Sequence, residues 1–568
     1  MFFAYFCTTN THIYSSKPLK TMSLVSFINH SHHRTILHKS FLVFGLAILV
    51  CLPVQAQRKQ HRQGRALDSA AAAEARVKEM WNLIQDRYVE SPDMDSLATQ
   101  AIVAMLKTLD PHSIYIPAKD VQKANENLQG NFEGVGISFQ IVDDTIHVVE
   151  VIEGGPSSKA GILPGDKIVR IDGRPAVGDS VNNTFVSNHL RGPKGSDVKI
   201  TMLRDNKELN FNITRGKVPI RSIDTWFMAN DTVGYIKLER FARTSVDEFR
   251  AALSDLRKQG MNSLMLDLRG NSGGFLDIAT SLANEFLASR KLIVYQEGRK
   301  QPRHSYSTNA SGRFREGKLV VMIDENSASA SEIVSGAVQD WDRGTIVGRR
   351  SFGKGLVQRM FSLKDGSQVR LTTARYYTPS GRCIQKPYKA GGDAYRNDIY
   401  ERYKHGELIS QDSIHFPDSL MFKTASGRIV YGGGGIMPDV FVPMDTTKLA
   451  DYFVTLRSKG LVNEFPLRWS EKHRAELKNL SFDQFLQNYD SYAVDDEFAA
   501  FAKAKGYATT DTTATGDPQR LLATENYMKL VLKALIAKNI YGTKHYYQIM
   551  KAVDPCYKKA YEVITINN

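Results

Sequence analysis

Cysteine is scarce in this chain of 568 residues, which contains four. Cys7 and Cys51 lie in an N-terminal leader, so the rest of the chain holds Cys383 and Cys556 alone. Two cysteines can form one disulfide in an oxidising compartment, but they exclude a disulfide-stapled scaffold. Neither has a histidine or a second cysteine at the spacing of metal ligands, so a zinc site is not supported. We therefore expect no metal and no other cofactor.

Long hydrophobic runs are also absent, apart from one of 14 residues at 41–54. Basic residues precede this run and Val54-Gln55-Ala56 end it, which is the pattern of a secretory signal peptide with cleavage after Ala56. A start at Met22 would give that signal a conventional length. Because a membrane-spanning helix needs about 18 residues or more, a permanent anchor is the weaker interpretation. The expected location is the periplasm or cell envelope, with membrane association through an uncleaved leader left open.

Acidic residues are too few to balance the basic ones, and the formal net charge is +14. The leader contributes basic residues and no acidic ones, which leaves about +10 for the mature chain. The surplus is spread along the sequence, and no block of basic residues interleaved with aromatic ones occurs. We therefore expect no nucleic-acid partner, but a weak attraction to anionic polymers of the envelope.

The length favours about three or four domains, and changes of pattern divide the chain. Residues 66–107 are rich in alanine and lack glycine, with Pro92 as a break, which indicates helices. From residue 218 apolar strands alternate with expected helices at 246–259, 275–288 and 330–341, which favours an α/β domain with a largely parallel sheet. The predicted segments are a leader and signal peptide at 1–56, an N-terminal helical region at 66–130, a strand-rich domain at 132–216, an α/β domain at 217–443 to which 109–131 can contribute, and a helical extension at 444–568.

The strand-rich segment 132–216 has short alternating strands punctuated by Gly and Pro. A loop, Gly134-Val135-Gly136, precedes an open strand that begins at Ile137, and helices are expected near 157–160 and 181–190. This order of elements resembles a PDZ domain, which binds an extended peptide end by strand addition. The resemblance implies that the terminal carboxylate and last apolar side chain of a substrate are received by Gly134, Val135, Gly136 and Ile137.

A serine-rich motif stands between an apolar strand and a helix in the α/β segment. It reads Asn326-Ser327-Ala328-Ser329-Ala330-Ser331-Glu332. A serine at such a turn presents its hydroxyl beside the free backbone N–H groups at the positive end of the helix, where an oxyanion can be stabilised. The alternative is structural, because Ser329 and Glu332 also form a capping box, and most capping boxes only begin helices.

Two further segments carry chemistry. Asp267-Leu268-Arg269-Gly270-Asn271-Ser272-Gly273-Gly274 follows another apolar strand, and its paired glycines let the main chain approach a substrate and direct an N–H toward it. Taken alone, it is equally a simple strand-to-helix turn. Ser351-Phe352-Gly353-Lys354-Gly355-Leu356-Val357-Gln358 places a lysine between glycines but lacks the spacing of a phosphate-binding loop. Its alternative is a solvated surface lysine.

These three segments, in this order and at these separations, resemble the carboxyl-terminal processing peptidases, or tail-specific proteases. The likeness runs from the LDPHS segment at 109–113 to GGGGIMPDV at 432–440. It implies that Ser329 is the nucleophile, that Lys354, 25 positions later, is the general base, and that Gln358 assists. The implied fold is an α/β protease domain of the crotonase/ClpP-like spiral type, with a largely parallel sheet, an inserted PDZ domain and helical N- and C-terminal regions.

The resemblance also places an oxyanion hole at the amides of Ala330 and of either Gly273 or Gly274. Arg191 is expected to couple tail binding to assembly of the catalytic site, with a surface arginine in a turn as the alternative. Cys383 stands where the family often carries serine, in a position without an assigned role.

The lysine can be tested against elementary chemistry. An amine acts as a base only when neutral, and an unperturbed lysine pKa near 10.4 leaves almost none neutral at pH 7. Lowering the pKa of Lys354 to about 7 or 8 requires about 3–5 kcal/mol of destabilisation of the ammonium, which an apolar cleft can supply. The Gln358 carbonyl can orient the amine without adding charge. A histidine triad is the alternative, but no motif pairs a histidine with Ser329; the candidates are His112, His147 and His304.

The expected function is therefore that of a serine endopeptidase that cleaves exported proteins after a PDZ domain recognises their C-terminal tails. The expected partners are tails of exported or unfolded proteins, with a second copy of the chain and an envelope adaptor protein left open. One rival is an inactive PDZ scaffold of the envelope, which would have lost the serine or the lysine. A second is an acyl-CoA enzyme of similar fold, which would lack the PDZ insertion and the export signal.

Overall fold

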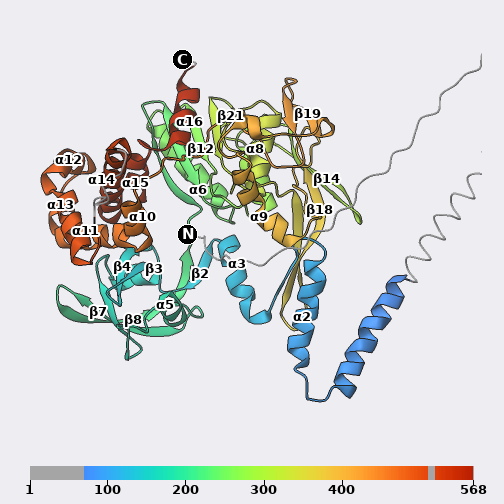
Figure 1. Ribbon diagram of the computed structural model, residues 1–568, viewed down its shortest axis with the longest axis horizontal. Coiled ribbons are helices and arrows are strands. Elements are labelled where there is room, and N and C mark those ends of the chain that lie inside the picture. The colour runs from blue at the N-terminus through green and yellow to red at the C-terminus, as the bar shows by residue number, and fades with distance from the viewer. Residues whose placement is uncertain (1–68, 509–517, 567–568) are drawn as a thin grey trace, which may run out of the picture. The chain divides into compact units, whose positions relative to one another are not determined.

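The computed structural model describes residues 69–508 and 518–566 (Figure 1). The chain divides into two compact units, of which the second begins at Asp95. The predicted signal peptide, its cleavage after Ala56 and the start at Met22 lie outside the described residues. On either side of Pro92 the described chain forms a helix at 69–87 and helix α2, Met94–Lys107. No described helix is both long enough and apolar enough to cross a membrane.

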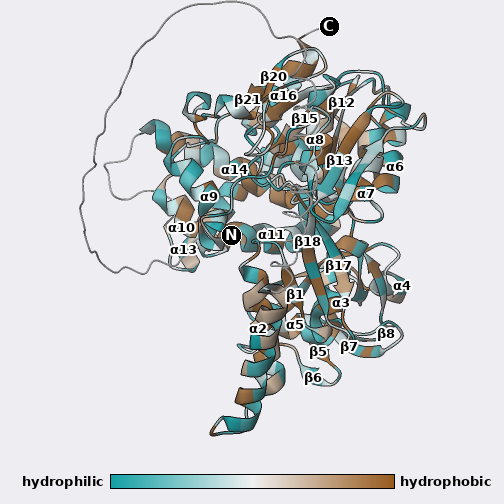
Figure 2. Cartoon of the chain, turned by 90° about the vertical axis from the view of Figure 1, so that its right-hand side faces the viewer, coloured by the Kyte–Doolittle hydropathy of each residue, from teal (hydrophilic) through white to brown (hydrophobic). Residues whose placement is uncertain are grey.

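A six-stranded sheet forms the centre of the second unit. Its strand order is β10-β11-β12-β15-β16-β21, and only the β10–β11 pair is antiparallel. Strands β11, β12 and β15 are buried along their whole lengths, as expected for parallel strands covered on both faces. Figure 2 shows the hydropathy of β12 and β15 and of the elements around them. The strands are β10 Ile223–Met228, β11 Val233–Leu238, β12 Ser263–Asp267, β15 Leu319–Ile323, β16 Thr345–Gly348 and β21 Val440–Phe441.

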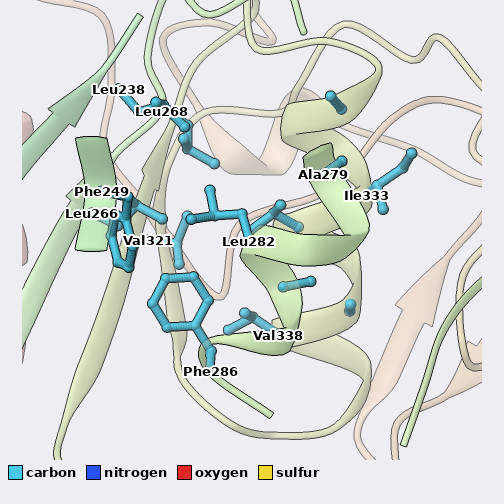
Figure 3. Close-up of a cluster of buried hydrophobic side chains, with 14 of the residues drawn as sticks. Leu238, Phe249, Leu266, Leu268, Ala279, Leu282, Phe286, Val321, Ile333 and Val338 are labelled. Atoms are coloured by element: carbon cyan, nitrogen blue, oxygen red, sulfur yellow. The ribbon is translucent and has the colours of Figure 1, made fainter. Parts of the chain in front are cut away.

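Three helices cover one face of this sheet where the sequence pattern predicts helices. They are α6 Ser245–Lys258, α7 Leu276–Asn284 and α8 Ala330–Asp340. Leu266 and Val321 of the sheet belong to one buried cluster with side chains from the helical layer (Figure 3). These are Leu282 of α7, Phe286 just after α7, and Val338 of α8. This packing fixes the strand-to-helix turns that precede α7 and α8.

The other face is covered by α16, Pro555–Thr565, from the far end of the chain. Met265 and Met322 alternate with residues of the first face and contact a cluster that includes Tyr557 and Ala560 of α16. The last helix of the predicted helical extension at 444–568 thus packs into the core of the α/β domain.

An antiparallel sheet packs beside the central one. Its order is β1-β18-β13-β14, with β17 also paired to β18. Strand β1 comes from the 109–131 segment, which thereby contributes to the α/β domain. The strands are β1 Ile114–Ile116, β13 Leu292–Gly298, β14 Gln301–Ser307, β17 Leu356–Ser362 and β18 Gln368–Tyr377; a small hairpin, β19 Met421–Lys423 and β20 Ile429–Tyr431, and helix α9, Gly392–Lys404, follow.

The PDZ-like segment forms its own sheet, ordered β3-β4-β5-β7-β8 with β6 on β5, around a separate apolar core. Helix α3, Val121–Gln129, leads into β2, which pairs with β9, so the chain enters and leaves this domain through adjacent strands. The elements are β2 Asn131–Gly134, β3 Ile137–Val142, β4 Thr145–Val151, α4 Pro156–Ala160, β5 Lys167–Ile171, β6 Arg174–Pro175, α5 Asn183–Leu190, β7 Asp197–Arg204, β8 Lys207–Thr214 and β9 Gly216–Pro219.

A helical segment with its own apolar core follows β21. Its helices are α10 Asp451–Ser458, α11 Leu461–Leu477, α12 Phe482–Asn488, α13 Val494–Ala504, α14 Pro518–Tyr541 and α15 Thr543–Met550.

Candidate active site

A cleft of about 650 Å³ opens where β12 and β15 end. All of the predicted catalytic and oxyanion residues line it, although they come from three separate segments: Ser329, Ala330, Gly273, Gly274, Lys354 and Gln358. Apolar side chains, among them Phe275, Ile333 and Leu356, form much of the remaining wall. Ligand sites in α/β sheets are expected at this carboxyl end of the parallel strands.

Ser329 has an unusual backbone conformation. It is the residue before α8, with φ 55° and ψ −110°, a region that residues other than glycine rarely adopt. Its neighbours hold it there. The Ser331 hydroxyl donates to the carbonyl oxygen of Asn271 at 2.8 Å, and the Ala328 amide donates to the same oxygen at 3.0 Å. These hydrogen bonds join the turn before α8, which carries Ser329, to the turn before α7, which carries Asn271. A strained residue that its neighbours hold in place is a candidate for function.

The carboxylate of Glu332 links the serine to the lysine. It is fully buried and accepts four hydrogen bonds. One oxygen accepts from the Ser329 amide at 2.8 Å and the Lys354 amide at 2.9 Å, and the other from the Gly353 amide at 2.7 Å and the Ser351 hydroxyl at 2.5 Å. The pKa of Glu332 is raised, because the effect of burial exceeds the lowering effect of the four donors. The sequence identified this residue only as a helix cap.

Tyr376 makes a second link between the same two residues. Its buried hydroxyl donates to the carbonyl oxygen of Lys354 at 2.6 Å and lies 3.1 Å from that of Ser329. The main chains of nucleophile and base candidates are therefore held together through both their amides and their carbonyls.

The pKa of Lys354 is lowered from its ordinary value. Burial is the largest cause, and the positive charge of Arg370 adds to it. The negative charge of Glu332 opposes both, but burial outweighs it. The direction is the one that a general base requires, because desolvation disfavours the ammonium form.

Gln358 lies on β17, beside the lysine loop. Its amide nitrogen donates to the Thr372 hydroxyl at 3.3 Å, and that hydroxyl donates to Asp110 at 3.0 Å. This arrangement leaves the carbonyl oxygen of the Gln358 side chain available as an acceptor. Asp110 belongs to the LDPHS segment at 109–113, and no local pattern in the sequence predicts that it lies beside Gln358.

The two glycines of the oxyanion turn differ in their hydrogen bonding. The Gly273 amide donates to the side chain of Asn271 at 2.9 Å. In the described part of the chain, no acceptor is found for the amides of Gly274 or Ala330. A Cβ on Gly273 would lie 2.8 Å from the Ser329 Cβ, so only glycine permits this close approach of the two turns.

None of the three histidines hydrogen-bonds Ser329. His112 contacts the Tyr395 hydroxyl at 2.9 Å, and burial together with the charge of Lys354 lowers its pKa to about 4. His147 contacts Glu471 in another domain. His304 stacks edge-on against Tyr306 on the second sheet. The geometry gives no support to a histidine triad.

The PDZ-like domain carries a small apolar cleft of about 130 Å³. Its lining includes the predicted residues Val135, Gly136, Ile137 and Arg191, together with side chains of β3 and α5. Among the described residues, no acceptor is found for the amides of Val135 and Gly136. Gly134 lies alongside, bridged to Arg191 through the main chain.

Arg191 is exposed, but its side chain is paired. Its guanidinium pairs with Glu126 of α3 at 2.5 Å and lies 4.6 Å from the centre of the Phe132 ring. Ala124 and Asn127 of the same helix line the catalytic cleft. Helix α3 therefore contacts both sites.

The two cysteines do not form the disulfide that the sequence left open, because Cys383 and Cys556 are both free. Within residues 69–508 and 518–566, no group of His, Cys, Asp and Glu side chains is arranged to hold a metal ion.

Comparisons with known proteins identify the family of the chain. Residues 232–391 match the model for peptidase family S41, residues 134–214 that for the PDZ domain, and residues 452–542 a family of unknown function, DUF8443. The carboxy-terminal-processing protease of Bartonella bacilliformis is 37% identical over 346 residues, which cover 60% of this chain and 79% of the relative. A probable CtpA-like serine protease of Staphylococcus haemolyticus is 32% identical over 311 residues, covering 54% and 62% respectively.

Among solved structures, a photosystem II D1 C-terminal processing protease is 26% identical with a TM-score of 0.34, covering 65% of this chain and 93% of that one. The sequence relatives and the matched models lead to one assignment. The chain belongs to peptidase family S41, as a carboxy-terminal-processing protease that carries a PDZ domain.

Proposed function

We propose that this protease is a serine endopeptidase that cleaves exported proteins with a Ser329–Lys354 dyad assisted by Gln358, after its PDZ domain has captured their C-terminal tails. The observation that carries the proposal is the double link between Ser329 and Lys354. Glu332 holds their amides and Tyr376 their carbonyls in one cleft.

In the proposed reaction the neutral form of Lys354, which burial favours, takes the proton of the Ser329 hydroxyl as the oxygen attacks a peptide carbonyl. The tetrahedral oxyanion is stabilised by amides, for which hydrogen-bond accounting favours Ala330 and Gly274 over the already engaged Gly273. The proton passes to the leaving amine, and an acyl-enzyme on Ser329 remains. Water, deprotonated by the same amine, then releases the acyl product.

Tail capture is proposed for the cleft between β3 and α5. The unengaged amides of Val135 and Gly136 suit a terminal carboxylate, and the apolar lining suits the last side chain. Arg191 is proposed to couple binding of a tail in the PDZ cleft to the catalytic cleft. Its partner Glu126 lies on α3, the helix that also lines the catalytic cleft.

A crotonase/ClpP-like spiral fold of the α/β domain and export to the periplasm or envelope are proposed as well. Helices that follow the parallel strands β11, β12 and β15 support a crotonase/ClpP-like spiral. The apolar run at 41–54 supports export to the periplasm or envelope. An inactive PDZ scaffold is disfavoured, because serine and lysine are both present and share a cleft. The PDZ match likewise disfavours an acyl-CoA enzyme.

The test is incubation of the mature chain with an unfolded reporter that ends in apolar residues, with product masses as the readout. We expect internal cleavage by the wild type and none by Ser329→Ala, which should still bind the reporter. The same reporter with an amidated end loses its charge-assisted hydrogen bonds and should be cleaved about tenfold to a hundredfold less efficiently. Undiminished cleavage by Ser329→Ala would contradict the proposal.

A further inference from the structure

His147 is buried on the face of β4 that points away from the PDZ core. Its neighbours on β4, Ile146 and Val148, have no exposed surface and belong to the PDZ core. Because side chains alternate along a strand, His147 points away from that core, yet it is only 6% exposed. Helix α11 covers this side chain: the Glu471 carboxylate lies at hydrogen-bond distance, 2.9 Å, from His147 Nδ1.

Charges at the turn between β3 and β4 extend this contact. Asp143 pairs with Arg468 of α11, and Lys505, which follows α13, lies 3.3 Å from the same carboxylate. Glu464 of α11 pairs with Arg468 at 2.9 Å and with Lys505 at 3.2 Å. Two anions and two cations thus join the PDZ hairpin to the helical segment. Figure 1 shows the strands β3 and β4 and the helix α11 that carry them.

One face of α11 carries the contact. Glu464, Arg468 and Glu471 are spaced four and three residues apart, so they share a side of the helix. The contacts described here are ion pairs and a hydrogen bond, and the apolar cores of the PDZ domain and of the helical segment remain separate. Farther along, Ile152 of the PDZ domain and Tyr541 of the helical segment line a cavity of about 690 Å³. Interfaces of this kind are typical of domains that separate without unfolding.

The contact leaves the peptide cleft open. The residues that line that cleft come from β2, β3, α5, the loop between β2 and β3, and Arg191 directly after α5; none comes from the helical segment. Without α11, the PDZ domain would be attached mainly through the β2–β9 ribbon and the Arg191–Glu126 pair. A two-stranded ribbon alone would let the PDZ domain change its orientation relative to the α/β domain.

We propose that the helical segment 452–542 is an intramolecular clamp for the PDZ domain. It binds the outer surface of the β3–β4 hairpin through charges and fixes the orientation of the peptide cleft relative to the catalytic cleft. This role, which rests on the proposed capture of tails, assigns a partner to a segment that matches a family of unknown function.

The direct test measures orientation. Spin labels are attached to exposed positions on the PDZ domain and the α/β domain, Arg174→Cys and Lys300→Cys, in a Cys383→Ser background. We expect a narrow distance distribution in the parent chain and a broad one when Arg468→Glu and Lys505→Glu reverse the cationic side. Asp143→Arg should restore the narrow distribution, because Asp143 is the one of the two anions that the PDZ domain contributes.

Lys472→Glu is the matched control, because Lys472 lies on the same helix but pairs with Glu497 inside the helical segment. It should leave the distribution narrow. An unchanged distribution in the doubly reversed chain, or no restoration by Asp143→Arg, would overturn the clamp.

Activity gives an independent readout. The doubly reversed chain should lose about fivefold to tenfold in kcat/KM on a tailed reporter, and none on a short peptide without a tail. Equal loss on both substrates would contradict the clamp, whereas absence of any cleavage by the wild type would contradict the proposed function and leave the spin-label result to decide the clamp.

Discussion

Replacement of Lys354 by methionine will lower kcat on a tailed reporter by about a thousandfold or more, while the chain stays folded. Methionine keeps the apolar stem of the side chain but has no base to take the Ser329 proton, and a positioned general base contributes about 10²–10⁴ in rate. Steady-state kinetics with a melting curve measure both effects.

The same prediction includes a pH dependence. Burial lowers the pKa of Lys354 from 10.5, and only the neutral amine accepts a proton. The kcat/KM of the wild type should therefore rise as pH rises through this lowered pKa, and Lys354→Met should lack that limb. Lys364→Met, at an exposed lysine, is the control and should behave as wild type. Residual activity within tenfold of wild type in Lys354→Met would contradict the base assignment.

Replacement of Glu332 by glutamine will have a comparably large effect through a different route. All four partners of the carboxylate are donors, but glutamine offers one acceptor oxygen and directs an NH₂ group at the remaining donors. Leaving two buried donors unsatisfied costs about 2–5 kcal/mol in the free energy of unfolding. Loss of the link between Ser329 and Lys354 should lower kcat about a hundredfold or more, because small misplacements of reacting groups are costly.

A pH profile separates this role from general destabilisation. The charge of Glu332 raises the pKa of Lys354, so its removal should shift the rising limb of the residual activity to lower pH. Glu325→Gln is the matched control, since Glu325 is also buried but pairs with Arg349 outside the cleft. It should destabilise the chain without moving the profile. A shift toward higher pH, or no shift, in Glu332→Gln would count against the link.

Four strands of the central sheet, β11, β12, β15 and β16, could be predicted from the sequence because they are apolar runs that alternate with helices. β1 could not, because three residues carry no periodicity and their partners on β18 lie some 250 positions away. The last helix, α16, has an apolar face, but nothing in that pattern says which sheet it covers. Its docking under β12 and β15 depends on long-range packing.

The candidate site divides in the same way. Ser329, Lys354 and Gln358 could be singled out because the family resemblance fixes their spacing, since each local motif alone has an ordinary structural meaning. Glu332 was visible only as a capping residue, because three of its four partners lie beyond the local helix turn. The choice between Gly273 and Gly274 depends on where the Asn271 side chain lies, which no sequence pattern reveals.

The most direct test of the dyad is labelling of the purified chain with a fluorophosphonate that reacts with activated serines, followed by mass mapping of the modified peptide. The modification should fall on Ser329, its rate should increase with pH, and it should disappear in Lys354→Met. Labelling of a different serine, or labelling of Ser329 at an undiminished rate without Lys354, would contradict the claim that a neutral lysine activates this hydroxyl.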